Sequence, residues 1–139
     1  YFHLNNLFTC IIIDIDLQNM EIYYCNAGHP EQYILVEDSI VELKKDRGTI
    51  IGISEHIKYE LHSHKIKPKN KILLFTDGAF EEFNIHGKEF GIDVFKSFIK
   101  ENKNLPVKDL CNLVSSKILT FIQNENLGDD ITLMGIEIK

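Results

Sequence analysis

The 139-residue sequence contains no tryptophan, three prolines and a single arginine, Arg47. Proteins that bind duplex nucleic acid neutralise phosphates with clustered lysine and arginine. A formal net charge of −6 with one arginine argues against that class and predicts a surface that attracts cations. We therefore expect no nucleic-acid partner.

Long apolar runs are also missing. The longest, Cys10 to Ile13, is far shorter than the roughly 18 residues that span a bilayer, and no signal-like segment opens the chain. The three cysteines form no Cys-x-x-Cys pair, which argues against a disulfide framework and a thiolate zinc site. We expect a cytoplasmic segment without membrane contact.

What is present suits one globular domain. The composition, 44% hydrophobic and 26% charged, is that of an ordinary folded protein. The opening "YFHLNNLFTC" has no initiator methionine and enters a strand pattern almost at once. We therefore expect these residues to come from a longer chain.

Most of the first half reads as short strands rich in Ile, Val, Tyr and Phe, with turn residues between them. Short connections favour an antiparallel meander. Two later segments carry apolar residues at helical spacing. The pattern predicts an α+β fold of mostly antiparallel strands with two C-terminal helices. The expected strands span 8–16, 21–26, 32–36, 40–44, 58–64, 71–75 and 130–138, and the expected helices 90–102 and 105–123.

Two acidic motifs fall at the ends of expected strands. Asp77 follows the strand at 71–75, where a carboxylate needs a cation or hydrogen-bond donors to stay ionised, and Gly78 is expected to turn the chain sharply. Asp129 and Asp130 precede the last strand. If the two strands are antiparallel neighbours, Asp77 and Asp129 converge and offer the oxygen ligands that Mg²⁺ and Mn²⁺ prefer. The alternative is that both motifs are only turns capped by aspartates.

Four short motifs occur in order: "NAGHP" at 26–30, "TDG" at 76–78, "EFG" at 89–91 and "DDIT" at 129–132. Together they resemble the SpoIIE/RsbU-type branch of the PPM (protein phosphatase 2C-like) serine/threonine phosphatases, over nearly the whole chain. The resemblance implies a PPM-type sandwich of two antiparallel sheets flanked by helices. It also implies a phosphatase in which two Mn²⁺ or Mg²⁺ ions activate the attacking water, so that no protein side chain is the nucleophile.

The resemblance further implies roles for individual residues. Asp77 and Asp129 match metal ligands of the family. His29 and Glu81 match positions that contact a third metal or phosphate, and Gly28, Gly78 and Asp130 match positions that turn the chain or support the ligands. Two alternatives stay open: His29 as a structural turn residue, and Glu81 as a solvated charge at a helix start. Arg47, in "RGTIIGI", is a further candidate for phosphate contact.

One part of the family pattern is missing. An upstream Gly-Asp-x-x-Asp-type motif bridges the two metals in the family, and nothing in residues 1–44 matches it. Asp14 and Asp16 do not replace it, because they fall where a strand enters a hairpin. Residues 1–139 are therefore expected to be the C-terminal part of a SpoIIE-like domain, and to be inactive alone.

The resemblance also implies partners. In this branch the substrate is phosphoserine on a regulatory protein such as a STAS-type anti-anti-sigma factor, and the full-length chain carries an N-terminal sensor or receiver domain. The rival hypotheses are a non-catalytic scaffold or partner-binding module with the same fold, and a purely structural α+β domain. Strand edges left open by a missing segment favour a homodimer.

Overall fold

The computed structural model describes residues 7–44, 50–54, 56–123 and 127–139. Arg47 lies outside this part of the chain. The chain divides into two compact units, which we call unit 1, within residues 1–31 and 43–67, and unit 2, within residues 32–42 and 68–139.

Unit 1 contains a three-stranded antiparallel sheet. Its strands are β1 (Cys10–Asp16), β2 (Glu21–Ala27) and β5 (His62–Lys65), in the order β1-β2-β5. Along β2, buried Ile22 and Tyr24 alternate with half-exposed residues, which is the pattern of a sheet with one covered face. β5 is shorter than the expected strand and begins at His62.

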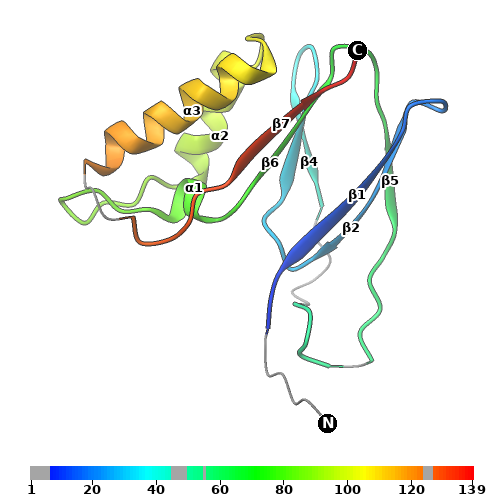
Figure 1. Ribbon diagram of the computed structural model, residues 1–139, viewed down its shortest axis with the longest axis horizontal. Coiled ribbons are helices and arrows are strands. Elements are labelled where there is room, and N and C mark those ends of the chain that lie inside the picture. The colour runs from blue at the N-terminus through cyan, green and yellow to red at the C-terminus, as the bar shows by residue number, and fades with distance from the viewer. Residues whose placement is uncertain (1–6, 45–49, 55, 124–126) are drawn as a thin grey trace. The chain divides into compact units, whose positions relative to one another are not determined.

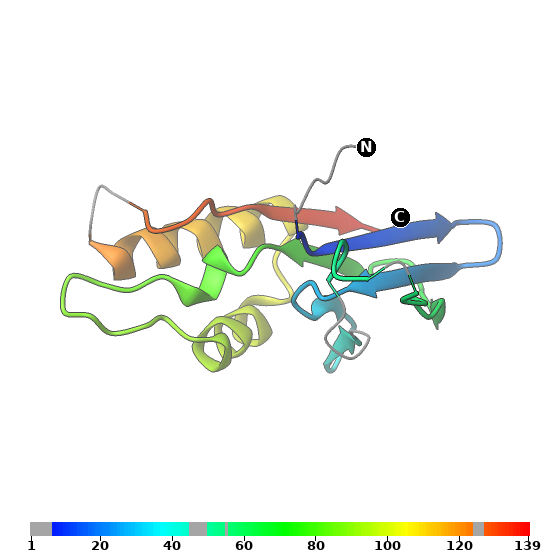
Figure 2. The same cartoon turned by 90° about the horizontal axis from the view of Figure 1, so that it is seen from below.

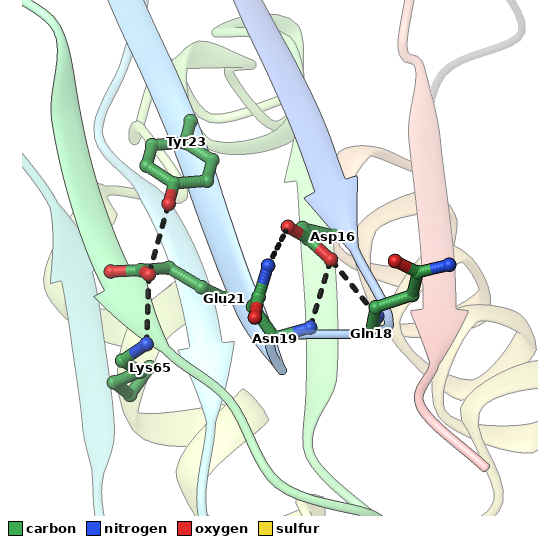
Figure 3. A network of polar contacts seen from close by, with 6 residues as sticks. All are labelled: Asp16, Gln18, Asn19, Glu21, Tyr23 and Lys65. Carbon is green, nitrogen blue, oxygen red and sulfur yellow. Dashed lines mark hydrogen bonds and ion pairs between the residues drawn. The ribbon is translucent and has the colours of Figure 1, made fainter.

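Polar side chains stabilise the β1–β2 hairpin and its neighbour β5 (Figure 3). The backbone N–H of Asn19 donates to Asp16 at 2.9 Å, and this bond holds the pKa of Asp16 below its ordinary value. Glu21 accepts from Lys65 at 2.8 Å and from the Tyr23 hydroxyl at 3.0 Å. The bond from Lys65 is the main cause of a lowered pKa at Glu21. Asp16 therefore serves the hairpin turn, as its position in the sequence indicates.

Unit 2 is built on a four-stranded antiparallel sheet. The strands β3 (Gln32–Leu35), β4 (Ile40–Leu43), β6 (Lys71–Phe75) and β7 (Leu133–Glu137) lie in the order β4-β3-β6-β7. The condition for Asp77 and Asp129 to converge is met, because β6, the strand before Asp77, pairs antiparallel with the last strand, β7. The expected simple meander is wrong. Strands β5 and β6 are consecutive in sequence but pair with β2 and β3 in different sheets.

Helices pack on the sheet of unit 2. The expected helices are present as α2 (Ile92–Asn102) and α3 (Val107–Ile122), and a single turn, α1 (Gly78–Glu81), adds a third. Figures 1 and 2 show α3 beside α2 and close to β7. Gly135 of β7 permits this approach, because a Cβ there would lie 2.3 Å from Cγ2 of Val107.

The core of unit 2 lies between the sheet and the helices. Phe75 of β6 and Phe95 of α2 meet edge to face, with ring centroids 4.7 Å apart. The expected α+β fold with two antiparallel sheets is confirmed. No helix in the described ranges is both long and apolar enough to cross a membrane. The core side chains are Tyr33, Leu35, Leu73, Phe75, Ala79, Phe90, Phe95, Ile99, Leu110, Val114, Ile118 and Ile122.

Candidate functional site

Thr76 connects the end of β6 to the loop that precedes β7. Its backbone N–H donates to the Thr132 carbonyl at 3.1 Å, continuing the ladder between the two strands. Its hydroxyl donates to the Asp130 carbonyl at 3.1 Å and accepts from the Thr132 N–H at 2.9 Å. One threonine side chain therefore joins the "TDG" and "DDIT" motifs.

Gly78 brings the start of α1 against the same loop. The chain turns here from β6 into α1, but Gly78 does not have a positive φ, so the turn does not use a backbone conformation reserved for glycine. Instead, a Cβ on this buried residue would lie 2.8 Å from the Asp130 carbonyl oxygen and 3.6 Å from Cβ of Asp129. Glycine is needed here because the two backbones approach closely.

The two aspartates each use one carboxylate oxygen in a local hydrogen bond. Asp77, half-buried at the N-cap of α1, accepts from the Gly78 N–H at 3.1 Å. Asp129, which is exposed, accepts from the Asp130 N–H at 2.7 Å. These are the bonds that the turn-capping alternative requires. Within the described ranges the second oxygen of each carboxylate has no hydrogen-bond partner, so it remains available to a ligand.

Glu82, which the sequence analysis missed, lies at the C-terminal end of α1 and binds the loop that precedes β7. Its side chain is 6% exposed, and its two oxygens accept from the Gly128 N–H at 3.2 Å and from the Asp129 N–H at 2.8 Å. In the sequence, Glu81 and Glu82 are adjacent glutamates shortly after Gly78. Nothing in their spacing indicates that Glu82 is the one that is buried.

Gln32 is a second residue that the sequence analysis missed. Its side chain is fully buried, donates to the Phe75 carbonyl at 3.1 Å and accepts from the Phe75 N–H at 2.5 Å. The side-chain amide of Gln32 thus takes the place of a backbone partner from β3 for the N–H and carbonyl of Phe75. It fixes the last residue of β6, two residues before Asp77.

Glu81 and Asp130 lie in the same part of unit 2. A helix does begin after Asp77, so Glu81 lies one turn along it, exposed, and its N–H donates to the Asp77 carbonyl at 2.9 Å. Asp130 acts through its backbone, donating to Asp129 and accepting from Thr76. Unit 2 therefore brings the "TDG" segment, α1 and the "DDIT" loop together.

His29 and Gly28 belong to unit 1. The His29 N–H donates to the Asn26 side chain at 2.8 Å, and Nδ1 of its ring lies 3.1 Å from the Thr9 hydroxyl. The first bond fixes the backbone of the turn, and the second is the contact that the ring itself makes with Thr9. Gly28 has a φ of 71°, and a Cβ there would lie 2.7 Å from Cγ2 of Ile50. This backbone conformation and this contact both favour glycine.

The donor set of unit 2 fits part of a metal site. Asp77 and Asp129 supply carboxylate oxygens, the ligand type that Mg²⁺ and Mn²⁺ prefer. However, in the part of the chain that the structure describes, no group of three or more His, Cys, Asp or Glu side chains is placed to hold a metal ion. A complete site would need further ligands.

A family model matches nearly the whole chain. The family model "Stage II sporulation protein E (SpoIIE)" matches residues 2–139. Phosphoserine phosphatase RsbP of Bacillus subtilis is 25% identical over 151 residues, which cover 99% of this chain and 35% of RsbP.

Two solved structures show the same fold. The SiaA-PP2C domain of Pseudomonas aeruginosa superposes with a TM-score of 0.84 at 18% identity, covering 96% of this chain and 53% of that one. The Mn-presoaked phosphatase domain of SpoIIE from Bacillus subtilis gives a TM-score of 0.70 at 20% identity, with 94% and 56% covered. The chain thus spans about a third of RsbP and little more than half of each solved domain.

Proposed function

Because the chain belongs to the SpoIIE family of PPM-type phosphatase domains, we propose that it acts in a metal-dependent phosphatase that hydrolyses phosphoserine on a regulatory protein. The observation that carries the proposal is the close approach of Gly78 to the Asp130 carbonyl, since a Cβ added to the residue after Asp77 would lie 3.6 Å from Cβ of Asp129. The name of RsbP, a phosphoserine phosphatase, supports the substrate class.

Asp77 and Asp129 would hold the Mn²⁺ or Mg²⁺ through their second carboxylate oxygens. When bound, such an ion polarises the phosphate and lowers the pKa of water. Thr76 and Glu82 hold the two ligand-bearing segments in place before any ion arrives. A chain with a net charge of −6 is suited to attracting the cation.

The remaining residues complete the proposal. His29 and Glu81 would contact a third metal or the phosphate, while Gly28, Gly78 and Asp130 shape the backbone around the ligands. Residues 1–139 would form the C-terminal part of the domain, and another segment would supply the bridging metal ligand. We further propose a phosphorylated STAS-type protein as substrate, an N-terminal sensor or receiver domain as companion, a cytoplasmic location and a homodimer.

Manganese titration of the full-length protein by calorimetry tests the proposal. The substitution Asp77→Asn keeps the size of the side chain and removes its charge, so Mn²⁺ binding and hydrolysis of a phosphoserine peptide should both be lost. Asp38→Asn, at an exposed residue between β3 and β4, should change neither. If the wild-type protein binds no Mn²⁺, the proposed function is wrong.

The rival is a non-catalytic scaffold or partner-binding module, with which the lack of three or more converging ligands among the described residues is also consistent. Under that hypothesis the full-length protein would bind a regulatory partner with no dependence on Mn²⁺ or on Asp77.

A second experiment tests residues 1–139 without the rest of the protein. We expect no robust Mn²⁺-dependent hydrolysis of p-nitrophenyl phosphate by this segment, because two aspartates bind a hydrated ion weakly.

A further inference from the structure

Glu82 is the buried carboxylate among the residues of unit 2 that the structure describes, and no motif marks it. We propose that Glu82 is a positioning residue that holds Asp129 in the geometry for binding a divalent cation. This inference rests on the proposed function, since it assigns Glu82 a role toward the same ion.

The burial of Glu82 requires compensation. A carboxylate removed from water is costly unless it is hydrogen-bonded or paired. No salt bridge compensates Glu82 among the described residues; its two oxygens instead accept two backbone N–H groups, at 3.2 Å from Gly128 and 2.8 Å from Asp129. Hydrogen bonds to a charged acceptor are stronger than those between neutral groups.

The geometry restricts the backbone of the ligand itself. Each oxygen of Glu82 serves one of two consecutive N–H groups, so the carboxylate fixes how the peptide between Gly128 and Asp129 is oriented. The direction of the Asp129 side chain follows from that orientation. The close fit extends to Gly128, where a Cβ would lie 3.3 Å from Oε1 of Glu82.

Helix α1 connects Glu82 to Asp77. Asp77 is the N-cap and Glu82 the C-cap of the single-turn helix α1. The backbone carbonyl of Glu82 also accepts from the Phe90 N–H at 2.9 Å, which fixes the end of that turn. One turn of helix therefore sets the spacing between the first proposed ligand and the group that holds the second.

The substitution Glu82→Gln tests the proposal in the full-length protein. Glutamine has the same shape, but its amide nitrogen cannot accept the second N–H, so one of the two bonds is lost. In metal-free protein, amide hydrogen exchange at Gly128 and Asp129 should accelerate about tenfold or more, because the lost bond is worth about 1.5–3 kcal/mol. Mn²⁺ affinity should fall about 10- to 100-fold, the usual effect of removing a group that orients a ligand.

Glu101→Gln is the matched control. Glu101 is exposed on α2, so its substitution should leave both amide exchange at the loop and Mn²⁺ affinity unchanged. Should Glu82→Gln fail to fold, Glu82→Asp keeps the charge, shortens the reach by one methylene and predicts the same two changes.

The outcomes separate this inference from the proposed function. Unchanged amide exchange, or faster exchange with unchanged Mn²⁺ affinity, overturns the role of Glu82 while loss of binding in Asp77→Asn still supports the metal site. Absence of Mn²⁺ binding in the wild-type protein overturns the proposed function, and the role of Glu82 with it.

Discussion

The carbonyl oxygen of Asp130 lies 2.8 Å from the position that a Cβ on Gly78 would occupy. Two acidic motifs more than 50 residues apart in the sequence thus meet through their backbones. The contact leaves no room for a methyl group, so it makes the arrangement of the proposed ligands sensitive to the smallest substitution.

Gly78→Ala should separate the two motifs. The added methyl would overlap a backbone carbonyl, which cannot rotate away as a side chain can, so we expect a loss of about 1–3 kcal/mol in the free energy of unfolding. Mn²⁺ affinity should fall with it, by about tenfold or more. Urea unfolding and calorimetry measure the two effects. Ser97→Ala, on the exposed face of α2, is the control, and equal effects of the two substitutions would contradict the close contact.

Gln32→Leu should weaken the end of β6. Leucine fills a similar volume but leaves the N–H and carbonyl of Phe75 without the partners that the amide supplies. A buried backbone group without a partner costs about 1–3 kcal/mol, so the free energy of unfolding should fall by at least this amount. Gln18→Ala, in the exposed β1–β2 turn, should be close to neutral. A Gln32→Leu protein as stable as wild type would show that β6 does not need this side chain.

Gly135→Ala should push α3 away from β7. The new methyl would lie 2.3 Å from Cγ2 of Val107 and 2.8 Å from Sγ of Cys111, and overpacking of this kind costs about 1–3 kcal/mol. Val107→Ala removes the nearer of the two atoms. A double-mutant cycle should therefore show the pair to be less destabilising than the sum of the single substitutions. Strict additivity would mean that Val107 does not limit the approach.

Glu21→Gln should make stability less dependent on acid pH. The bond from Lys65 lowers the pKa of folded Glu21 below the unfolded value, so the carboxylate stabilises the fold above the unfolded pKa, about 4.3. That contribution is lost as the pH falls through the folded pKa. Urea unfolding should therefore show the variant to be less stable than wild type at pH 7 and equal to it in strong acid. A difference that persists or grows in acid would contradict the assigned cause, and Glu101→Gln should show no such trend.

Local patterns were sufficient for much of the fold. The apolar run before Asp77 predicted β6 with its observed bounds, and helical spacing predicted α2 and α3. These elements depend on periodicities of two and 3.6 residues, which neighbours in sequence determine. Pairing between β2 and β5 was not predictable in this way, because residues 28–61 separate the two strands in the sequence.

Residues without a motif show where sequence reasoning ended. Glu82 and its neighbour Glu81 are chemically identical, yet one is buried and holds a loop while the other is exposed. Gln32 similarly follows a recognisable motif but bonds to a strand 43 residues later. Neither role has a local signal, because each requires a backbone group that only the folded chain brings within hydrogen-bond distance.

By itself, the sequence determined the family, the strand before Asp77, the two long helices and the two aspartates at strand ends. Only the tertiary structure decided why Gly78 is a glycine, which glutamate supports Asp129, and which strands share a sheet. The physical reason is the distance along the sequence over which each interaction acts. Strands and helices follow the periodicity of side chains within a few residues. Close backbone approach and burial of a carboxylate depend on distant segments that meet only after the chain has folded.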